Sequence, residues 1–222
     1  MVKLSARLSK VASFIPDGAY LADIGSDHAY LPIYLVEQGR ISIAQAIDNK
    51  MAPYLRMKNN VNDAGYSAKI SCSLSSGLDE VRPDVDCLAI CGVGGLLTCQ
   101  MLEEGKSKLE NIKTIVLDPH RDLKAVRERV SALGFHLEDE AMIYEGKIYY
   151  SIMKWGRGAP KKKYSLDELE FGPILMRKKE PIFLEWMGIQ LKKVSGILNM
   201  NLSPEKRQHY LDLYRRIKAQ IS

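Results

Sequence analysis

The sequence predicts an α/β protein whose sheet has five parallel strands and closes with an antiparallel hairpin. Short apolar runs alternate with amphipathic segments from residue 19 to residue 133, and this alternation predicts five parallel β-α units in a row. Two more strand-like segments then meet at Glu145-Gly146. They leave no room for a helix between them, so we expect them to pair as an antiparallel hairpin.

Each element of this prediction follows from a local pattern. Leu4, Leu8, Val11 and Ile15 recur at helical spacing and predict a lead-in helix over residues 3–15, which ends at a Pro-Asp-Gly turn. The apolar runs predict parallel strands over residues 19–24, 42–47, 68–72, 85–91 and 113–118. The intervening patterns predict helices over residues 31–38, 53–64, 96–104 and 123–133, and the hairpin strands are expected over residues 135–145 and 147–155.

After Trp155 the strand pattern stops. The segment "GRGAPKKKYS" has the composition of a linker, and helices are expected to begin near Pro181 and after Ser203, which precedes a proline at the first helical position. Apolar residues at spacings of three and four residues predict that these two helices pair as an antiparallel helical hairpin. We therefore expect a catalytic domain over residues 1–157 and a helical extension over residues 158–222.

The charge distribution differs between these two parts. Residues 1–155 contain 18 basic and 20 acidic side chains, whereas residues 156–222 contain 14 and 7. The positive excess of the last third favours a polyanionic partner over a small neutral one.

Composition indicates the cellular compartment of the protein and whether it binds a metal. The chain is 46% hydrophobic, and it shows neither a secretion signal nor an apolar stretch long enough to span a membrane. Its four cysteines form no C-x-x-C pair and have no histidine nearby, so they are expected to be reduced thiols rather than metal ligands. We expect a cytoplasmic monomer without a metal.

Polar residues and glycines stand where the predicted parallel strands end. Ligands of open parallel sheets bind outside the carboxyl ends of the strands, so these segments are expected to converge on one crevice. They are Asp23-Ile24-Gly25-Ser26-Asp27, Asp48-Asn49, Ser76-Gly77 and Gly92-Val93-Gly94-Gly95.

The first of these segments restricts the cofactor. No G-x-G-x-x-G follows the first strand, and two carboxylates there would repel a pyrophosphate. S-adenosylmethionine instead carries an ammonium and a sulfonium, which carboxylates attract. Asp48 is placed to accept hydrogen bonds from both ribose hydroxyls of an adenosine. Class I methyltransferases also have five parallel units closed by an antiparallel hairpin, whereas a nicotinamide-binding domain would continue with a sixth parallel unit.

Longer motifs make the resemblance specific. The segments "DIGSDHAYLP", "CGVGGLL", "GKIYYSI" and "FGPILMRKKEPIFLEW" resemble the bacterial tRNA (adenine-N1)-methyltransferase family that modifies adenine 22. The resemblance runs from about Leu4 to the C-terminus. It implies a class I methyltransferase domain with a coiled-coil-like extension, S-adenosyl-L-methionine as cofactor and tRNA as partner.

The resemblance also implies roles for individual positions. Cofactor contacts are expected from the loop after the first strand, from the second and third strand ends, and from the glycine-rich segment: Asp23, Gly25, Ser26, Asp27, His28, Asp48, Asn49, Ser76, Gly77, Gly92, Val93 and Gly94. Gly95, Tyr30 and His120 are expected on the side of the target base. The chain departs from the family at Leu117-Asp118-Pro119-His120, where relatives typically read "LQPN", and at "IDNKMAPY", where "EVVEGPY" is more usual.

The expected chemistry depends on positioning. Adenine N1 carries a free lone pair near neutral pH, so alignment with the methyl group should supply most of the rate. An acceptor near the base would stabilise the positive charge that it gains. Asp118 is the leading candidate for this catalytic role and Asp27 the alternative, while Tyr30 and Tyr149 are candidates for stacking on a flipped base.

Phosphate contacts are expected from the basic residues of the last third, with binding that weakens steeply with salt. These residues are Lys161, Lys162, Lys163, Arg177, Lys178, Lys179, Arg215 and Arg216. Two other functions stay open at this point. The first is a methyltransferase acting on another RNA base, a small molecule or a protein; the basic tail argues against the small molecule and the protein. The second is a catalytically inactive tRNA-binding adaptor, against which the acidic strand ends argue.

Overall fold

The computed structural model describes residues 2–160 and 162–221. Its contacts divide the chain into two compact units, Met1–Lys163 and Tyr164–Ser222, each treated by itself below. Lys161, one of the predicted phosphate contacts, lies outside the described residues.

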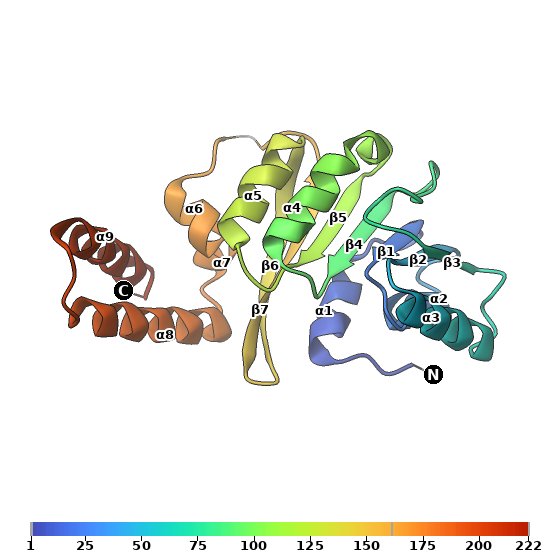
Figure 1. Cartoon of the computed structure of the whole chain (residues 1–222), viewed down its shortest axis with the longest axis horizontal. Coiled ribbons are helices and arrows are strands. Elements are labelled where there is room, and N and C mark those ends of the chain that lie inside the picture. The colour runs from blue at the N-terminus through green and yellow to red at the C-terminus, as the bar shows by residue number, and fades with distance from the viewer. Residues whose placement is uncertain (1, 161, 222) are drawn as a thin grey trace. The chain divides into compact units, whose positions relative to one another are not determined.

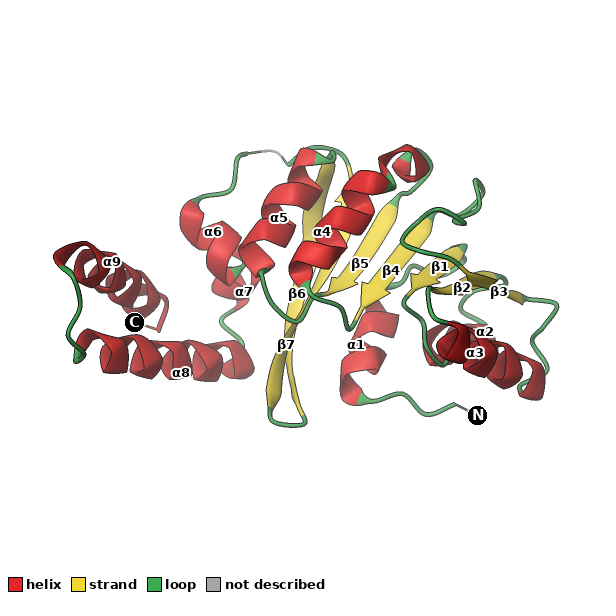
Figure 2. Cartoon of the chain, in the orientation of Figure 1, coloured by secondary structure: helices red, strands yellow, loops and turns green. Residues whose placement is uncertain are grey.

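The first unit contains one seven-stranded sheet in the order β3-β2-β1-β4-β5-β7-β6 (Figure 2). Its first five strands are parallel and the last two antiparallel, which confirms the predicted fold class. The strands are β1 (Leu21–Ile24), β2 (Ala44–Asp48), β3 (Ile70–Leu74), β4 (Cys87–Cys91), β5 (Thr114–Asp118), β6 (Phe135–Glu145) and β7 (Ile148–Arg157).

Helices cover both faces of this sheet (Figure 1). One face carries α1 (Ala6–Phe14), α2 (Tyr30–Glu37) and α3 (Met51–Asp63), whose apolar residues share one core cluster. The other carries α4 (Gly95–Glu104) and α5 (Leu123–Ala132), which contact each other. The strands β1, β2 and β5 are buried along their whole length, because a parallel sheet covered on both faces has no solvent side.

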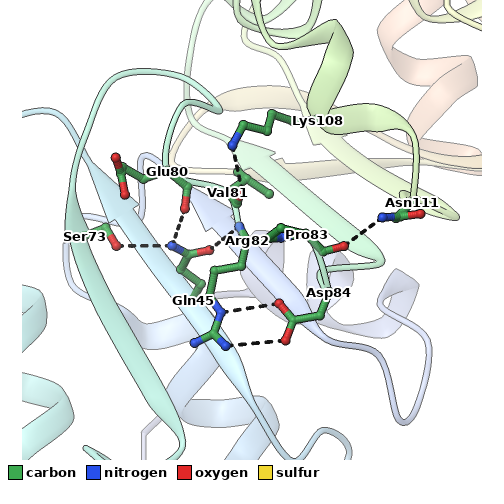
Figure 3. Close-up of polar contacts among 9 residues, drawn as sticks. All are labelled: Gln45, Ser73, Glu80, Val81, Arg82, Pro83, Asp84, Lys108 and Asn111. Atoms are coloured by element: carbon green, nitrogen blue, oxygen red, sulfur yellow. Dashed lines mark hydrogen bonds and ion pairs between the residues drawn. The ribbon is translucent and has the colours of Figure 1, made fainter.

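The predicted elements of this unit are present, with ends displaced by three residues at most. The expected number of five β-α units was wrong: β3 is followed by a loop, so helices follow four of the five parallel strands. The loop spans residues 75–86 and is fixed by the buried Gln45 of β2, whose amide nitrogen donates to Ser73 Oγ (3.2 Å) and Glu80 O (2.7 Å) (Figure 3). The Gln45 amide oxygen accepts from Arg82 N at 3.3 Å.

The hairpin extends past the carboxyl edge of the parallel strands. Leu117, next to the end of β5, pairs with Met153 of β7, so the part of β7 from Ile148 to Ile152 lies beyond that edge (Figure 1). The helix α1 contacts β5, β6 and β7. The extension of the hairpin therefore brings residues of the chain start and of β7 to the edge where ligands of parallel sheets bind.

The second unit is helical: α6 (Leu166–Phe171), α7 (Pro173–Lys178), α8 (Pro181–Leu198) and α9 (Pro204–Ile221). The predicted pairing of the last two helices is confirmed, and the apolar residues Phe183, Met187 and Val194 of α8 are buried. The sequence reading missed α6 and α7, because helices of six residues show too little periodicity. A capping box, in which Ser165 and Glu168 cap each other's backbone, was the available signal.

Candidate active site

Two adjoining cavities lie at the carboxyl ends of β1, β2 and β4. The larger, of about 510 Å³, is lined by Asp48, Asn49 and residues of the β3–β4 loop, α3 and α4, and the smaller, of about 280 Å³, by Asp23, residues that follow β1 and the start of α1. Both cavities share a wall made of Gly25, Asp27, Cys91 and Gly92. The strand ends therefore converge on one site, as the sequence predicts.

The loop after β1 folds back tightly onto β2. Gly25 has a φ of +74°, a conformation that favours glycine. The amides of Gly25 and Ser26 both donate to Ile47 O, at 2.8 and 3.1 Å. The Ser26 hydroxyl donates to Asp23 Oδ2 at 2.5 Å. These bonds hold the loop backbone at the boundary between the two cavities.

Asp23 is a buried carboxyl group on the wall of the smaller cavity. Only 5% of the residue is exposed. Burial raises the pKa of Asp23 to about 6; the Ser26 hydrogen bond opposes the rise and the neighbouring Asp48 adds to it. A cation in the cavity would favour the ionised form of this group.

Asp48 lines the larger cavity and is held by two backbone amides. Its Oδ1 accepts from Lys50 N at 3.0 Å and its Oδ2 from Asp27 N at 3.4 Å. Asn49, Gly77, Gly92 and Val93 also line this cavity, whereas Ser76 is exposed and lines neither cavity. The neighbouring Ser75 takes its place on the wall.

Asp27 borders both cavities and pairs with Arg56 of α3. The aspartate side chain is about half exposed (49%). His28 and Tyr30 line the smaller cavity, and their rings stack with centroids 4.9 Å apart. Tyr30 is thus an aromatic surface at the rim of the site.

Gly94 and Gly95 line neither cavity. A Cβ on Gly95 would lie 2.3 Å from Arg121 O, and one on Gly94 3.6 Å from Arg121 Nε. At Gly95, therefore, the lack of a side chain allows α4 to approach the segment before α5. This packing role was not part of the sequence reading.

Asp118 has different surroundings from those expected of a group that contacts the target base. It is fully buried, lines neither cavity and accepts a hydrogen bond from Arg7 Nη1 of α1. Burial raises the pKa of Asp118, while Arg7 opposes the rise. His120 lies against Tyr150, edge to face, with centroids 5.6 Å apart, and lines neither cavity. The structure thus brings Asp118 to Arg7 and not to the wall of either cavity.

The sequence analysis did not single out two arginines on the cavity walls, Arg7 and Arg56, nor Tyr150, which contacts Arg7. Arg7 lines the smaller cavity, and its guanidinium carbon is 5.0 Å from the centroid of the Tyr150 ring. The tyrosine that was predicted, Tyr149, instead contacts Tyr144 of β6. Successive side chains of a strand point to opposite faces, so only the register of β7 identifies Tyr150 as the neighbour of α1.

The predicted phosphate contacts are distributed over the linker and the helical unit. Lys162 and Lys163 are exposed, as are Arg177, Lys178 and Lys179 at the end of α7. Of the two arginines predicted in α9, Arg216 forms ion pairs with Asp167 and Glu170, at 2.5 Å to the latter, and Arg215 is 3.3 Å from Asp212. Intramolecular carboxylates therefore compete with phosphate for both arginines.

Metal-ligating groups and membrane spans were sought in the part of the chain that the structure describes. Residues 2–160 and 162–221 include no cluster of three or more histidine, cysteine, aspartate or glutamate side chains able to bind a metal ion. The same residues form no helix with the length and apolarity needed to cross a membrane.

Comparison with known proteins gives consistent results. Residues 21–222 match a family model described as TrmK, tRNA (adenine(22)-N(1))-methyltransferase. The Bacillus subtilis tRNA (adenine(22)-N(1))-methyltransferase is 34% identical over 88% of this chain and 84% of its own.

Solved structures agree over nearly the whole chain. Streptococcus pneumoniae Sp1610 in complex with S-adenosyl-L-methionine superposes with a TM-score of 0.92 at 34% identity, covering 99% of this chain and 100% of its own. M. capricolum TrmK in complex with S-adenosyl-homocysteine superposes with a TM-score of 0.88 at 27% identity, covering 98% of this chain and 97% of its own.

Five parallel strands closed by an antiparallel hairpin, with carboxylates and glycines at the strand ends, define a class I S-adenosylmethionine-dependent methyltransferase. The family match and the 34% identity to the Bacillus subtilis enzyme identify the family within this class. The chain belongs to the TrmK family of tRNA (adenine(22)-N(1))-methyltransferases.

Proposed function

We propose that this chain methylates N1 of adenine 22 in tRNA, with S-adenosyl-L-methionine spanning the two adjoining cavities. The observation that carries the proposal is the pair of carboxylates, Asp48 in the larger cavity and Asp23 in the smaller, on either side of the Gly25 turn. The membership of the TrmK family supports the substrate.

The residues on the cavity walls fit this cofactor. Asp48 is placed to accept hydrogen bonds from the two ribose hydroxyls, because backbone amides fix its carboxylate at the end of β2. Met101 and Leu97 supply apolar surface for a nucleobase in the same cavity, next to Gly77. Asp23 offers its carboxylate to the ammonium group, while Gly25 lets the backbone pass close to the ligand.

The target adenine is expected beside Gly92 and Val93, where the two cavities meet. When bound, the cofactor supplies an electrophilic methyl group. The protein contributes orientation, because the N1 lone pair needs no base to activate it. Asp27, half-exposed on the shared wall, is placed to stabilise the positive charge that the base gains. Tyr30 offers a stacking surface for the flipped base.

The domain containing the sheet is proposed to perform the chemistry, and the helical extension to add contacts with tRNA. The exposed Lys162 and Lys163 of the linker and the exposed basic end of α7 support this division, because phosphate contacts dominate affinity for nucleic acids. Their contribution should decline steeply as salt increases. A cytoplasmic, monomeric enzyme is proposed, in keeping with the sequence analysis.

The decisive experiment uses purified protein, S-adenosyl-L-methionine and unmodified tRNA transcripts. Reverse transcription should stop one nucleotide before position 22 is copied, because 1-methyladenine cannot form a Watson-Crick pair. A transcript with guanine at position 22 serves as the matched control and should give no new stop. Methylation of the control transcript, or a stop at another position, would contradict the proposed target. No transfer to any tRNA would favour the adaptor, and transfer to a small molecule or a protein the other alternative.

A further inference from the structure

The cofactor assigned above has one anionic group for which the expected site residues provide no partner. S-adenosyl-L-methionine carries an ammonium, a sulfonium and an α-carboxylate. Asp23, Asp27 and Asp48 suit its cations and its hydroxyls, but all three would repel the carboxylate. A site that binds the whole amino-acid end therefore needs a cation close to Asp23.

Among the described residues, Arg7 is the arginine that shares the smaller cavity with Asp23. Lys50 and Arg56 line only the larger cavity, and Arg56 is paired with Asp27. His28 lines the smaller cavity too. A guanidinium, however, keeps its charge across the working pH range and binds a carboxylate through two parallel hydrogen bonds.

Arg7 is held in place before any ligand arrives. Its Nη1 donates to the fully buried Asp118, and the guanidinium lies over the Tyr150 ring with 5.0 Å between its carbon and the centroid. About 20% of the side chain remains exposed. The Nη1 atom is 3.9 Å from the position of a Cβ on Gly92, so the guanidinium borders the shared wall of the cavities.

Arg7, Asp23 and Asp118 surround the end of β4. The Cys91 thiol of this strand interacts electrostatically with all three charged groups, and it lines both cavities. A positive group fixed by Asp118 and a negative group at Asp23 thus stand near the same point of the smaller cavity. This arrangement is complementary to the zwitterion of an α-amino acid.

We propose that Arg7 binds the α-carboxylate of the cofactor and that Asp118 is a positioning residue that acts through Arg7. The proposal rests on the proposed cofactor site and adds the group that recognises its amino-acid end. The proposal gives the lead-in helix α1 a role, because this helix brings Arg7 to the edge of the sheet. It also gives a role to Asp118, the residue at which this chain departs from the "LQPN" of its relatives.

The test compares two ligands that differ in this end. S-adenosylhomocysteine contains the α-amino carboxylate, and 5′-methylthioadenosine lacks it while keeping the nucleoside and sulfur. In calorimetric titrations, Arg7→Ala is expected to lower the affinity for S-adenosylhomocysteine about 10-fold to 100-fold, as expected for the loss of a charged hydrogen bond. Its affinity for 5′-methylthioadenosine should stay within about twofold of the unchanged protein. Arg7→Lys should restore part of the first affinity.

Lys10→Ala is the matched control, because it removes a cation from the same helix at a position that lines neither cavity. It should leave both affinities unchanged. Asp118→Asn should also lower the affinity for S-adenosylhomocysteine, as Arg7→Ala does. Combining it with Arg7→Ala should add no further loss, since Asp118 has no role once Arg7 is gone.

Three outcomes would overturn the proposal. Equal weakening of both ligands by Arg7→Ala would indicate a general effect on the fold, and thermal melting of Arg7→Lys would reveal it independently. Unchanged binding of S-adenosylhomocysteine with a raised KM for tRNA would place Arg7 on the substrate side. Additive losses in the double variant would give Asp118 a role of its own. The ligand titrations need no methylation of tRNA, and only the KM measurement does. A failure of the proposed function would therefore leave the titrations interpretable.

Discussion

Asp23→Asn is expected to make the ligand-free protein more stable and cofactor binding weaker. In the folded protein the pKa of Asp23 is about 6, compared with 3.8 for a free aspartate, chiefly because burial disfavours the charged form. Folding therefore requires Asp23 to give up part of its preference for ionisation at neutral pH. A charged carboxylate is retained there despite this cost, because it can bind a cation.

The size and sign of the stability effect follow from the two pKa values. The contribution of Asp23 to stability is fully present below about pH 4 and is lost as the pH rises through about 6. The loss is about 3 kcal/mol at pH 7.5 and about half of that at pH 5, since one pH unit corresponds to 1.36 kcal/mol. Asparagine has no charge to lose and can still accept the Ser26 hydrogen bond. At pH 7.5 the variant should gain up to about 10 °C in Tm.

Melting curves at pH 5 and pH 7.5 measure the stability effect, and calorimetry with S-adenosylhomocysteine at the same pH values measures binding. The unchanged protein should bind more tightly at pH 7.5 than at pH 5, because the ammonium of the ligand needs an ionised Asp23. The variant should bind about 10-fold to 100-fold more weakly at pH 7.5, with little dependence on pH. Asp63→Asn, which removes an exposed carboxylate at the end of α3, is the control and should alter neither property strongly. A variant no more stable than the parent at pH 7.5 that binds equally well would refute this reasoning.

Two further substitutions test the packing and the buried ion pair of the first unit. Glu140→Gln should lower the free energy of unfolding by about 3–5 kcal/mol in urea titrations, because Arg127 would keep a buried charge without an ionised partner. In the unchanged protein the two side chains are 2.8 Å apart. A loss below about 1 kcal/mol would contradict this expectation. Gly95→Ala should cost about 1–3 kcal/mol by the same measurement, because the new methyl group would lie 2.3 Å from Arg121 O. A stable Gly95→Ala protein would mean that α4 and the segment before α5 separate easily.

Much of the fold could be predicted from local patterns. The alternation of apolar and amphipathic segments predicted the parallel strands and their helices, and the short Glu145-Gly146 turn predicted the hairpin. Local pattern was insufficient where an element is too short to show a period, as in α6 and α7. It was also insufficient at the β3–β4 connection, where a buried Gln45 stabilises a loop through hydrogen bonds to distant backbone atoms.

The candidate site divides in the same way. The sequence alone determined the strand-end residues Asp23, Gly25 and Asp48, because strand ends of a parallel sheet meet at one edge whatever the rest of the chain does. Only the tertiary structure decided that Asp118 is buried against Arg7, since this contact joins positions 111 residues apart. No periodicity connects such positions: packing of α1 onto the hairpin and the register of β7 bring the charges together.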